Sequence, residues 1–224
     1  MTDFAVARRN MVDGQLRTFD VRDRAVLTAM EEVPREAFVP EGREALAYLD
    51  QNLALPGSGE EDDPRTMLAP MVLARLIQAL AIEPGSTVLD VGGGLGYSAA
   101  VLARLGAEVT LLESRSDLAE AAGQRLAASG LRVRQANGPL SAGVSGQAPF
   151  DAILVNGAIE EHPTDLLKQL DDGGRLACLR AEGRSCKAML FGRSGAAVGF
   201  RTLFDATAPV LAAFRRAPAF VFGT

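Results

Sequence analysis

A glycine-rich segment constrains the fold of this chain more than any other feature. It runs from Val88 to Tyr97 with the sequence VLDVGGGLGY. Its glycines directly follow the apolar run that begins at Thr87. Residues 98–105 follow with the spacing of a helix. Strand, glycine turn and helix in this order open a βαβ unit, and glycine permits both a tight turn and the close approach of a ligand to the backbone. The segment therefore predicts an α/β fold with a ligand site at the end of this strand.

The residues after this segment continue the alternation of strands and helices. Short connections join the last apolar runs, which favours an antiparallel edge, whereas the earlier alternation indicates right-handed crossovers in a mainly parallel sheet with both faces covered. We expect a Rossmann-like, doubly wound α/β fold with a mainly parallel seven-stranded sheet, an antiparallel edge and an N-terminal helical extension. The expected helices are 117–129 and 164–170, and the expected strands are 87–91, 108–112, 131–135, 150–155, 175–179, 187–191, 199–204 and 219–222.

Residues 1–80 form the predicted N-terminal extension. Residues 5–32 have helical spacing, and Asp20 is a candidate N-cap for the stretch that begins at Val21. Pro34 and Pro40 bracket a segment that cannot continue a helix, residues 55–64 (LPGSGEEDDP) have the composition of a loop, and Pro70 opens a further helix. We expect this extension, with its substrate-side loop, to pack on the core of residues 81–224 as one globular unit.

The charge balance restricts the partners of this chain. Lys and Arg number 23 and Asp and Glu 28, a net charge of −5, and no basic stripe is present, which argues against a nucleic-acid partner. The sequence has neither an apolar run of about 18 residues nor a signal peptide, so we expect no membrane contact and a cytoplasmic location. Cys178 and Cys186 match no zinc or redox spacing, and we interpret them as packed apolar side chains. His162 is interpreted as a solvated loop residue, and no metal site is expected.

An acidic residue before the glycines favours a cationic ligand. Asp90 precedes the glycines of the turn, which are Gly92, Gly93, Gly94 and Gly96. A carboxylate here would repel a pyrophosphate, whereas S-adenosyl-L-methionine carries an ammonium and a sulfonium group and no phosphate. Two alternatives remain open. Residues 94–99 also fit the G-x-G-x-x-A pattern of a dinucleotide site, as in an NAD-dependent oxidoreductase, and the glycines can form a purely structural turn.

Further polar residues lie at the ends of later strands. Glu113 follows Asp90 by 23 positions, and an acidic side chain at roughly this separation can accept hydrogen bonds from both hydroxyls of a ribose. Asn137 and Gly138 close the next strand, where an amide could bind an adenine edge or simply form a turn. Asn156 follows the fourth strand and faces the crevice where open α/β sheets bind ligands, either to contact substrate or to cap a turn.

These motifs, in this order, resemble the protein-L-isoaspartate O-methyltransferases, a family of class I S-adenosylmethionine-dependent methyltransferases. The resemblance covers about the first 180 residues and is carried by Met11-Val12 with Gln15-Leu16, Val33–Pro40 (VPREAFVP), Tyr48–Asp50, Ala69-Pro70, the run VLDVGGGLGYSAAVLARL, Glu113, Pro149–Val155 (PFDAILV) and Leu170–Leu176. It implies that Asp90, Gly92, Gly94 and Gly96 hold the methionine end of S-adenosyl-L-methionine, Glu113 the ribose and Asn137 the adenine. Gly93, Tyr97, Ser114 and Gly138 are the further cofactor contacts expected, and S-adenosyl-L-homocysteine is the product.

The resemblance also implies a reaction. An isoaspartyl carboxylate of a protein or peptide substrate attacks the sulfonium methyl group in line and becomes a methyl ester. Because a carboxyl group has an intrinsic pKa of about 4, the nucleophile is already ionised at neutral pH and needs no general base. Catalysis then consists of positioning and desolvation.

One segment departs from the family pattern. The family carries a Gln-Thr-Ile-Ser run whose Ser is implicated in handling the substrate carboxylate, and the aligned residues here are Arg65, Thr66, Met67 and Leu68. Leu68 has no hydroxyl group, and the acidic run 60–63 cannot help to bind an anion. Arg65 could compensate by a bidentate contact with a carboxylate. Asn137 likewise replaces an acidic residue of the family. A diverged paralogue with another substrate and a non-catalytic cofactor-binding module therefore stay open as alternatives.

Overall fold

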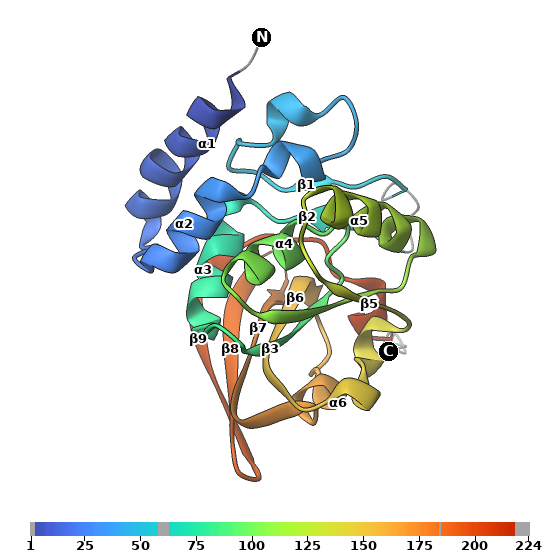
Figure 1. Ribbon diagram of the computed structural model, residues 1–224. Helices are drawn as coiled ribbons and strands as arrows, with labels where there is room; N and C mark the ends of the chain where they lie inside the picture. The colour runs from blue at the N-terminus through green and yellow to red at the C-terminus, as the bar shows by residue number, and fades with distance from the viewer. Residues whose placement is uncertain (1–2, 58–62, 184, 218–224) are drawn as a thin grey trace, which may run out of the picture.

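A seven-stranded sheet forms the centre of the molecule (Figure 1), whose computed structural model describes residues 3–57, 63–183 and 185–217. The strand order is β5-β4-β3-β6-β7-β8-β9. Neighbours from β5 to β7 pair in parallel, and β8 and β9 add an antiparallel edge, so the predicted sheet is confirmed. The strands are β3 (Thr87–Val91), β4 (Glu108–Glu113), β5 (Arg134–Asn137), β6 (Phe150–Ile159), β7 (Leu170–Glu182), β8 (Ser185–Ser194) and β9 (Ala197–Ala206).

Helices cover both faces of the sheet, as the doubly wound prediction requires. Because side chains alternate along a strand, Leu154 of β6 joins one apolar cluster while Ile153 and Val155 join the other. The first cluster packs against α3 (Pro70–Leu80), α4 (Tyr97–Arg104) and α5 (Ser116–Ala128). The second lies beneath α6 (Thr164–Leu167) and the 3₁₀ turns Leu140–Ala142 and Ala212–Phe214.

The N-terminal extension is helical over most of the predicted range, but its second helix begins later than predicted. Helix α1 (Phe4–Met11) continues into a π-helical turn, Val12–Leu16, and a 3₁₀ turn, Arg17–Phe19, and α2 (Arg24–Glu32) begins only after a break. Figure 1 shows α1, α2 and α3 together at one side of the molecule. Residues 5–32 are thus mostly helical as predicted, but the second stretch begins at Arg24 and not at Val21.

The break has an identifiable cause in tertiary hydrogen bonds. Gln78 of α3 accepts from the backbone N–H groups of Arg22 and Asp23 at 2.6 and 2.9 Å, which replaces the bonds a continuous helix would make. Asp20 adopts a left-handed conformation with φ of 64°, and Asp23 is the N-cap of α2, accepting from the backbone of Ala25 and Val26. Asp20 is thus not the predicted cap.

Other boundaries differ by a few residues. Strand β5 lies later than the predicted strand 131–135, and α6 is shorter than the predicted helix 164–170 because Leu170 already belongs to β7. The predicted loop 55–64 lies between the two strands of a short antiparallel hairpin, β1 (Leu53–Ala54) and β2 (Thr66–Met67). The predicted strand 219–222 lies outside the described residues. None of the helices in the described ranges combines the length and hydrophobicity that a membrane span requires.

Candidate active site

The polar residues predicted at the strand ends lie along one edge of the sheet. Asp90 of β3 and Glu113 of β4 belong to adjacent parallel strands, and Glu113 is paired in register with Asn137 of β5. Asn156 belongs to β6 on the other side of β3. Since the carboxyl ends of parallel strands coincide, the glycine turn after β3 stands in the middle of these four side chains.

Asp90 is fully buried beneath the glycine turn. One of its oxygens, Oδ1, accepts from Nδ2 of Asn156 at 2.6 Å, and Oδ2 accepts from the hydroxyl of Ser98 at 2.7 Å. Burial raises the pKa of Asp90 to about 6, although both hydrogen bonds favour its ionised form. A Cβ atom on Gly93 would overlap its carboxylate. The carboxylate of Asp90 is therefore enclosed, and its two side-chain partners, Ser98 and Asn156, line the adjacent pocket.

The glycine turn needs its glycines for two different reasons. Gly92, Gly94 and Gly96 have positive φ angles of 66°, 58° and 94°. At Gly94 space is also limiting, because a Cβ atom would overlap Cδ1 of Leu55. The backbone N–H of Gly94 donates to Oε2 of Glu113 at 3.1 Å, so the turn is tied directly to the end of β4.

Glu113 is fully buried and joins three segments of the chain. Its Oε1 accepts from the backbone N–H groups of Ser114 and Arg115 at 2.9 and 3.2 Å and from Nε of Arg65 at 3.2 Å. Arg65 is 1% exposed, and its other nitrogens donate to Asp63 and to the hydroxyl of Ser114. The guanidinium predicted to face a substrate carboxylate is thus held by a carboxylate of the protein.

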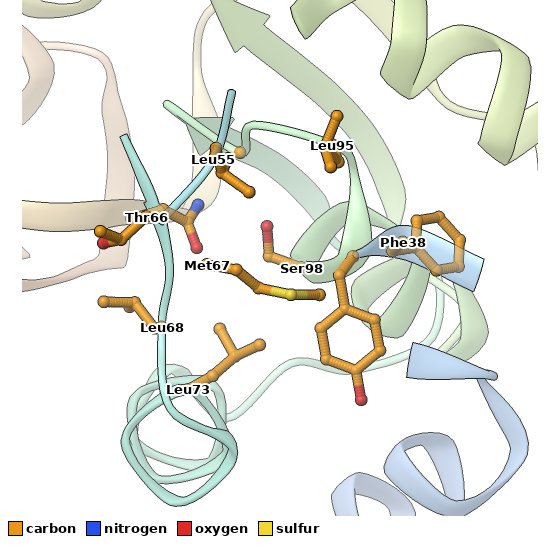
Figure 2. A pocket seen from close by; sticks show the side chains of 11 residues that line it. Phe38, Leu55, Thr66, Met67, Leu68, Leu73, Leu95 and Ser98 are labelled. Atoms are coloured by element: carbon orange, nitrogen blue, oxygen red, sulfur yellow. The ribbon is translucent and has the colours of Figure 1, made fainter. Parts of the chain in front are cut away.

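A narrow pocket beside Ser98 is bordered by Thr66, Met67 and Leu68, from the segment that departs from the family pattern (Figure 2). Leu55, Met67 and Ser98 reach toward its middle in this view, with Thr66 and Leu68 along one wall. The cavity measures about 10 Å³, near the smallest space that holds one water molecule. Leu68, which the resemblance aligns with the Ser of the family, is buried.

A buried arginine fixes the backbone of this wall. Arg35 is fully buried and donates to the carbonyl oxygens of Ala47 and Leu68 at 2.7 and 2.8 Å. Its guanidinium lies 4.7 Å from the ring centre of Tyr97, and burial lowers its pKa. Tyr97 borders the pocket with its ring while its hydroxyl faces the sulfur of Met30, so its predicted cofactor contact involves at most the ring. Neither Arg35 nor Ser98 was predicted, although Ser98 stands in the first helical turn after the glycines.

The remaining predicted residues lie at the edge of the site or away from it. Asn137 is exposed and Gly138 half-buried beside Glu113. Of the acidic run, Asp63 is described and contacts Arg65, whereas residues 60–62 lie outside the described residues. His162 is exposed and packs its ring edge-on against Phe191 of the second cluster. Cys178 and Cys186 are buried thiols, and among the described residues no group of His, Cys, Asp or Glu side chains could hold a metal ion.

The donors and acceptors fit an adenosyl amino acid better than a dinucleotide. A buried carboxylate beneath the glycine turn favours a cation and opposes a pyrophosphate. A second carboxylate on the next strand can accept from a diol, and a third strand end offers an amide. This order matches the methionine, ribose and adenine parts of S-adenosylmethionine.

Comparisons with known proteins match one family over most of the chain. The family model described as Protein-L-isoaspartate(D-aspartate) O-methyltransferase matches residues 7–201. The protein-L-isoaspartate O-methyltransferase of Methylorubrum populi is 49% identical over 176 residues, covering 79% of this chain and 79% of the relative. Protein-L-isoaspartate O-methyltransferase 1 of Rhodopseudomonas palustris is 44% identical over 178 residues, 78% of this chain and 69% of the relative.

Solved structures share the fold. A structure described as protein-L-isoaspartate O-methyltransferase aligns with a TM-score of 0.80 and 26% identity over 91% of this chain, which spans 65% of the length of that protein. A putative protein-L-isoaspartate O-methyltransferase from Plasmodium falciparum, solved in complex with S-adenosyl-L-homocysteine, aligns with a TM-score of 0.74 and 21% identity, covering 94% of this chain and 99% of that one. The Rossmann-like α/β prediction is thereby confirmed.

Proposed function

Since the chain belongs to the protein-L-isoaspartate(D-aspartate) O-methyltransferase family, we propose that it transfers a methyl group from S-adenosyl-L-methionine to a carboxylate of isoaspartyl residues in damaged proteins. The family match over residues 7–201 is the observation that carries this proposal. It also decides between the ligands that the glycine turn left open, in favour of S-adenosylmethionine over NAD. A cytoplasmic location stays a prediction.

The cofactor-binding roles follow from the order of the strand ends. Asp90, with Ser98 and Asn156, provides the negative environment for the methionine ammonium group. Glu113, supported by Gly94 and Ser114, accepts from the ribose hydroxyls, and Asn137 with Gly138 borders the adenine. The bound cofactor supplies an electrophilic methyl group on a cationic sulfur.

The protein's own contribution to the reaction is positioning and exclusion of water. The substrate carboxylate arrives ionised at neutral pH and needs no base. The wall formed by Thr66, Met67 and Leu68 borders the pocket beside Asn156 and would hold the carboxylate against the methyl group. Arg35 keeps this wall in place through the carbonyl of Leu68. An apolar wall of this kind removes water from the nucleophile, and fixed geometry lowers the entropic part of the barrier.

Methyl ester formation on an isoaspartyl peptide tests the function directly. Leu68→Ser restores the hydroxyl of the family, and we expect it to raise kcat/KM by about tenfold or more, the value of one hydrogen bond to a charged group. Leu68→Ala is the matched control, because it removes the same bulk without adding a hydroxyl. No ester formation by the wild type or by Leu68→Ser would reject isoaspartyl substrates.

The same assay and one titration distinguish the proposed activity from two alternatives. A diverged paralogue would bind S-adenosyl-L-homocysteine but leave isoaspartyl peptides unmethylated, and Leu68 is the residue that favours this alternative. A non-catalytic module would bind the cofactor and methylate no carboxylate substrate at all. Calorimetric titration with S-adenosyl-L-homocysteine establishes binding independently of turnover.

A further inference from the structure

Arg65 makes a contact that the substrate role predicted from its sequence position does not explain. Its guanidinium is 1% exposed and bridges Glu113, Asp63 and the hydroxyl of Ser114. Arg65 and Glu113 are separated by 48 positions and come from different elements, so the contact joins the β1–β2 hairpin to the core sheet. Both side chains of this ion pair are 1% exposed, at a separation of 3.2 Å.

The hydrogen-bonding capacity of Glu113 is largely used in this arrangement, and that of its Oε1 is full. Its oxygens accept from the backbone N–H groups of Gly94, Ser114 and Arg115 and from Nε of Arg65. Each carboxylate oxygen offers about two acceptor positions, so Oε1 with three donors has none free and Oε2, which accepts from Gly94, keeps one, too few for both hydroxyls of a ribose diol. Three of these donors are backbone groups that define the glycine turn and the end of β4. Arg65 is the donor that can leave without unfolding either.

The residues beside Arg65 fill the space through which a ligand would approach Glu113. The backbone N–H of Leu55 donates to the carbonyl of Arg65 at 3.0 Å, and the Leu55 side chain packs against the face of Gly94 where a Cβ atom would overlap it. Beside it the cavity is only about 10 Å³, far below the several hundred Å³ of typical ligand sites. The hairpin residues therefore occupy the approach to Glu113 in the free chain.

We propose that Arg65 is a built-in competitor of the cofactor, whose guanidinium must leave Glu113 before the ribose hydroxyls can bind there. This inference rests on the proposed function, since it takes Glu113 as the ribose acceptor. Asp63 and Ser114 remain as partners for the released guanidinium, so the side chain loses one of its three acceptors and keeps the other two. Cofactor affinity is then set by the difference between two contacts of Glu113, one to Arg65 and one to ribose.

The substitution Arg65→Gln tests this competition. It removes the charge and places at this position the residue that the family run carries. We expect the dissociation constant of S-adenosyl-L-homocysteine, measured by calorimetry, to fall about tenfold, the value of one charge-assisted hydrogen bond. Arg104→Gln is the matched control, because it removes an arginine from an exposed ion pair with Glu32 and should leave the affinity unchanged. An unchanged or higher dissociation constant in folded Arg65→Gln would overturn the proposal.

A measurement on the wild-type chain keeps the test independent of that variant's folding. The Nε–H signal of Arg65 in a nitrogen-15 spectrum is identified by its loss in Arg65→Lys, which keeps the charge. We expect slow exchange with water in the free chain and fast exchange once S-adenosyl-L-homocysteine saturates the site. Binding that leaves this signal protected rejects the competition alone, whereas absence of binding by the wild type rejects the proposed function as well.

Discussion

At the residue scale, we expect the carboxylate of Asp90 to make cofactor binding depend on pH. Burial raises its pKa to about 6, so it is largely protonated at pH 5 and ionised at pH 8. The ammonium group of the ligand is attracted to the ionised form, so binding must displace a proton below pH 6. We predict that the dissociation constant of S-adenosyl-L-homocysteine is flat above pH 7 and rises as pH falls below 6, by at most about tenfold per pH unit.

The variant Asp90→Asn assigns this dependence to one residue. It should bind more weakly at pH 8 and lose the rise between pH 7 and pH 5, since its side chain does not titrate. Calorimetry across this range measures both effects. If the variant keeps the pH dependence of the wild type, another group is responsible and Asp90 does not face the cation.

Residues at strand ends could be predicted from the sequence, whereas the distant residues of the same chain that contact them could not. Asp90 and Glu113 follow apolar runs directly, and parallel strands bring such ends together whatever the rest of the fold does. The contact between Arg65 and Glu113 depends on how the hairpin packs, and no local pattern encodes it. The same holds for Arg35, whose hydrogen bonds to Ala47 and Leu68 span 12 and 33 positions.

At the scale of elements, the start of α2 distinguishes two aspartates that look alike in the sequence. Asp23 accepts from two backbone N–H groups as the N-cap, whereas Asp20 forms an exposed ion pair with Arg22. We predict that Asp23→Ala lowers the free energy of unfolding by about 1 kcal/mol. Asp20→Gly should cost less, because glycine accepts the positive φ at this position and exposed ion pairs contribute little. Urea denaturation of both variants measures the difference, and equal losses would contradict this assignment.

The elements that could be predicted are those whose own sequence specifies them. The strand β3 and the helix α3 appear where apolar spacing and Pro70 place them. The hairpin of β1 and β2 has two residues in each strand, too few to leave a pattern, and it is held by contacts with the glycine turn. The exact start of α2 also needed information from α3, because Gln78 accepts from the backbone N–H groups of Arg22 and Asp23 directly before that helix.

At the scale of the whole molecule, one apolar cluster joins the N-terminal extension to the core. Met11 and Met30 of the extension belong to the same buried cluster as Val101 and Leu111 of the core, and the rings of Phe38 and Tyr97 lie 5.9 Å apart. Removing residues 1–80 would expose this face of the sheet to water. The division at residue 80 therefore separates two parts of the sequence that we expect to fold only together.

Full-length protein and the fragment 81–224 provide the test. We predict a single cooperative unfolding transition for the full chain, with its midpoint raised by S-adenosyl-L-homocysteine, because a ligand that binds only the folded state stabilises it.

Two probes follow the two parts of the chain. The chain has two tyrosines and no tryptophan, so Tyr48→Phe leaves Tyr97 of the core as the fluorescence probe, while circular dichroism follows the helices of both parts. The two transitions should coincide, and the fragment should neither unfold cooperatively nor bind the ligand, since it lacks the helices that bury α4 and the hairpin that borders the glycine turn. A fragment that folds and binds would show that the extension serves the substrate alone.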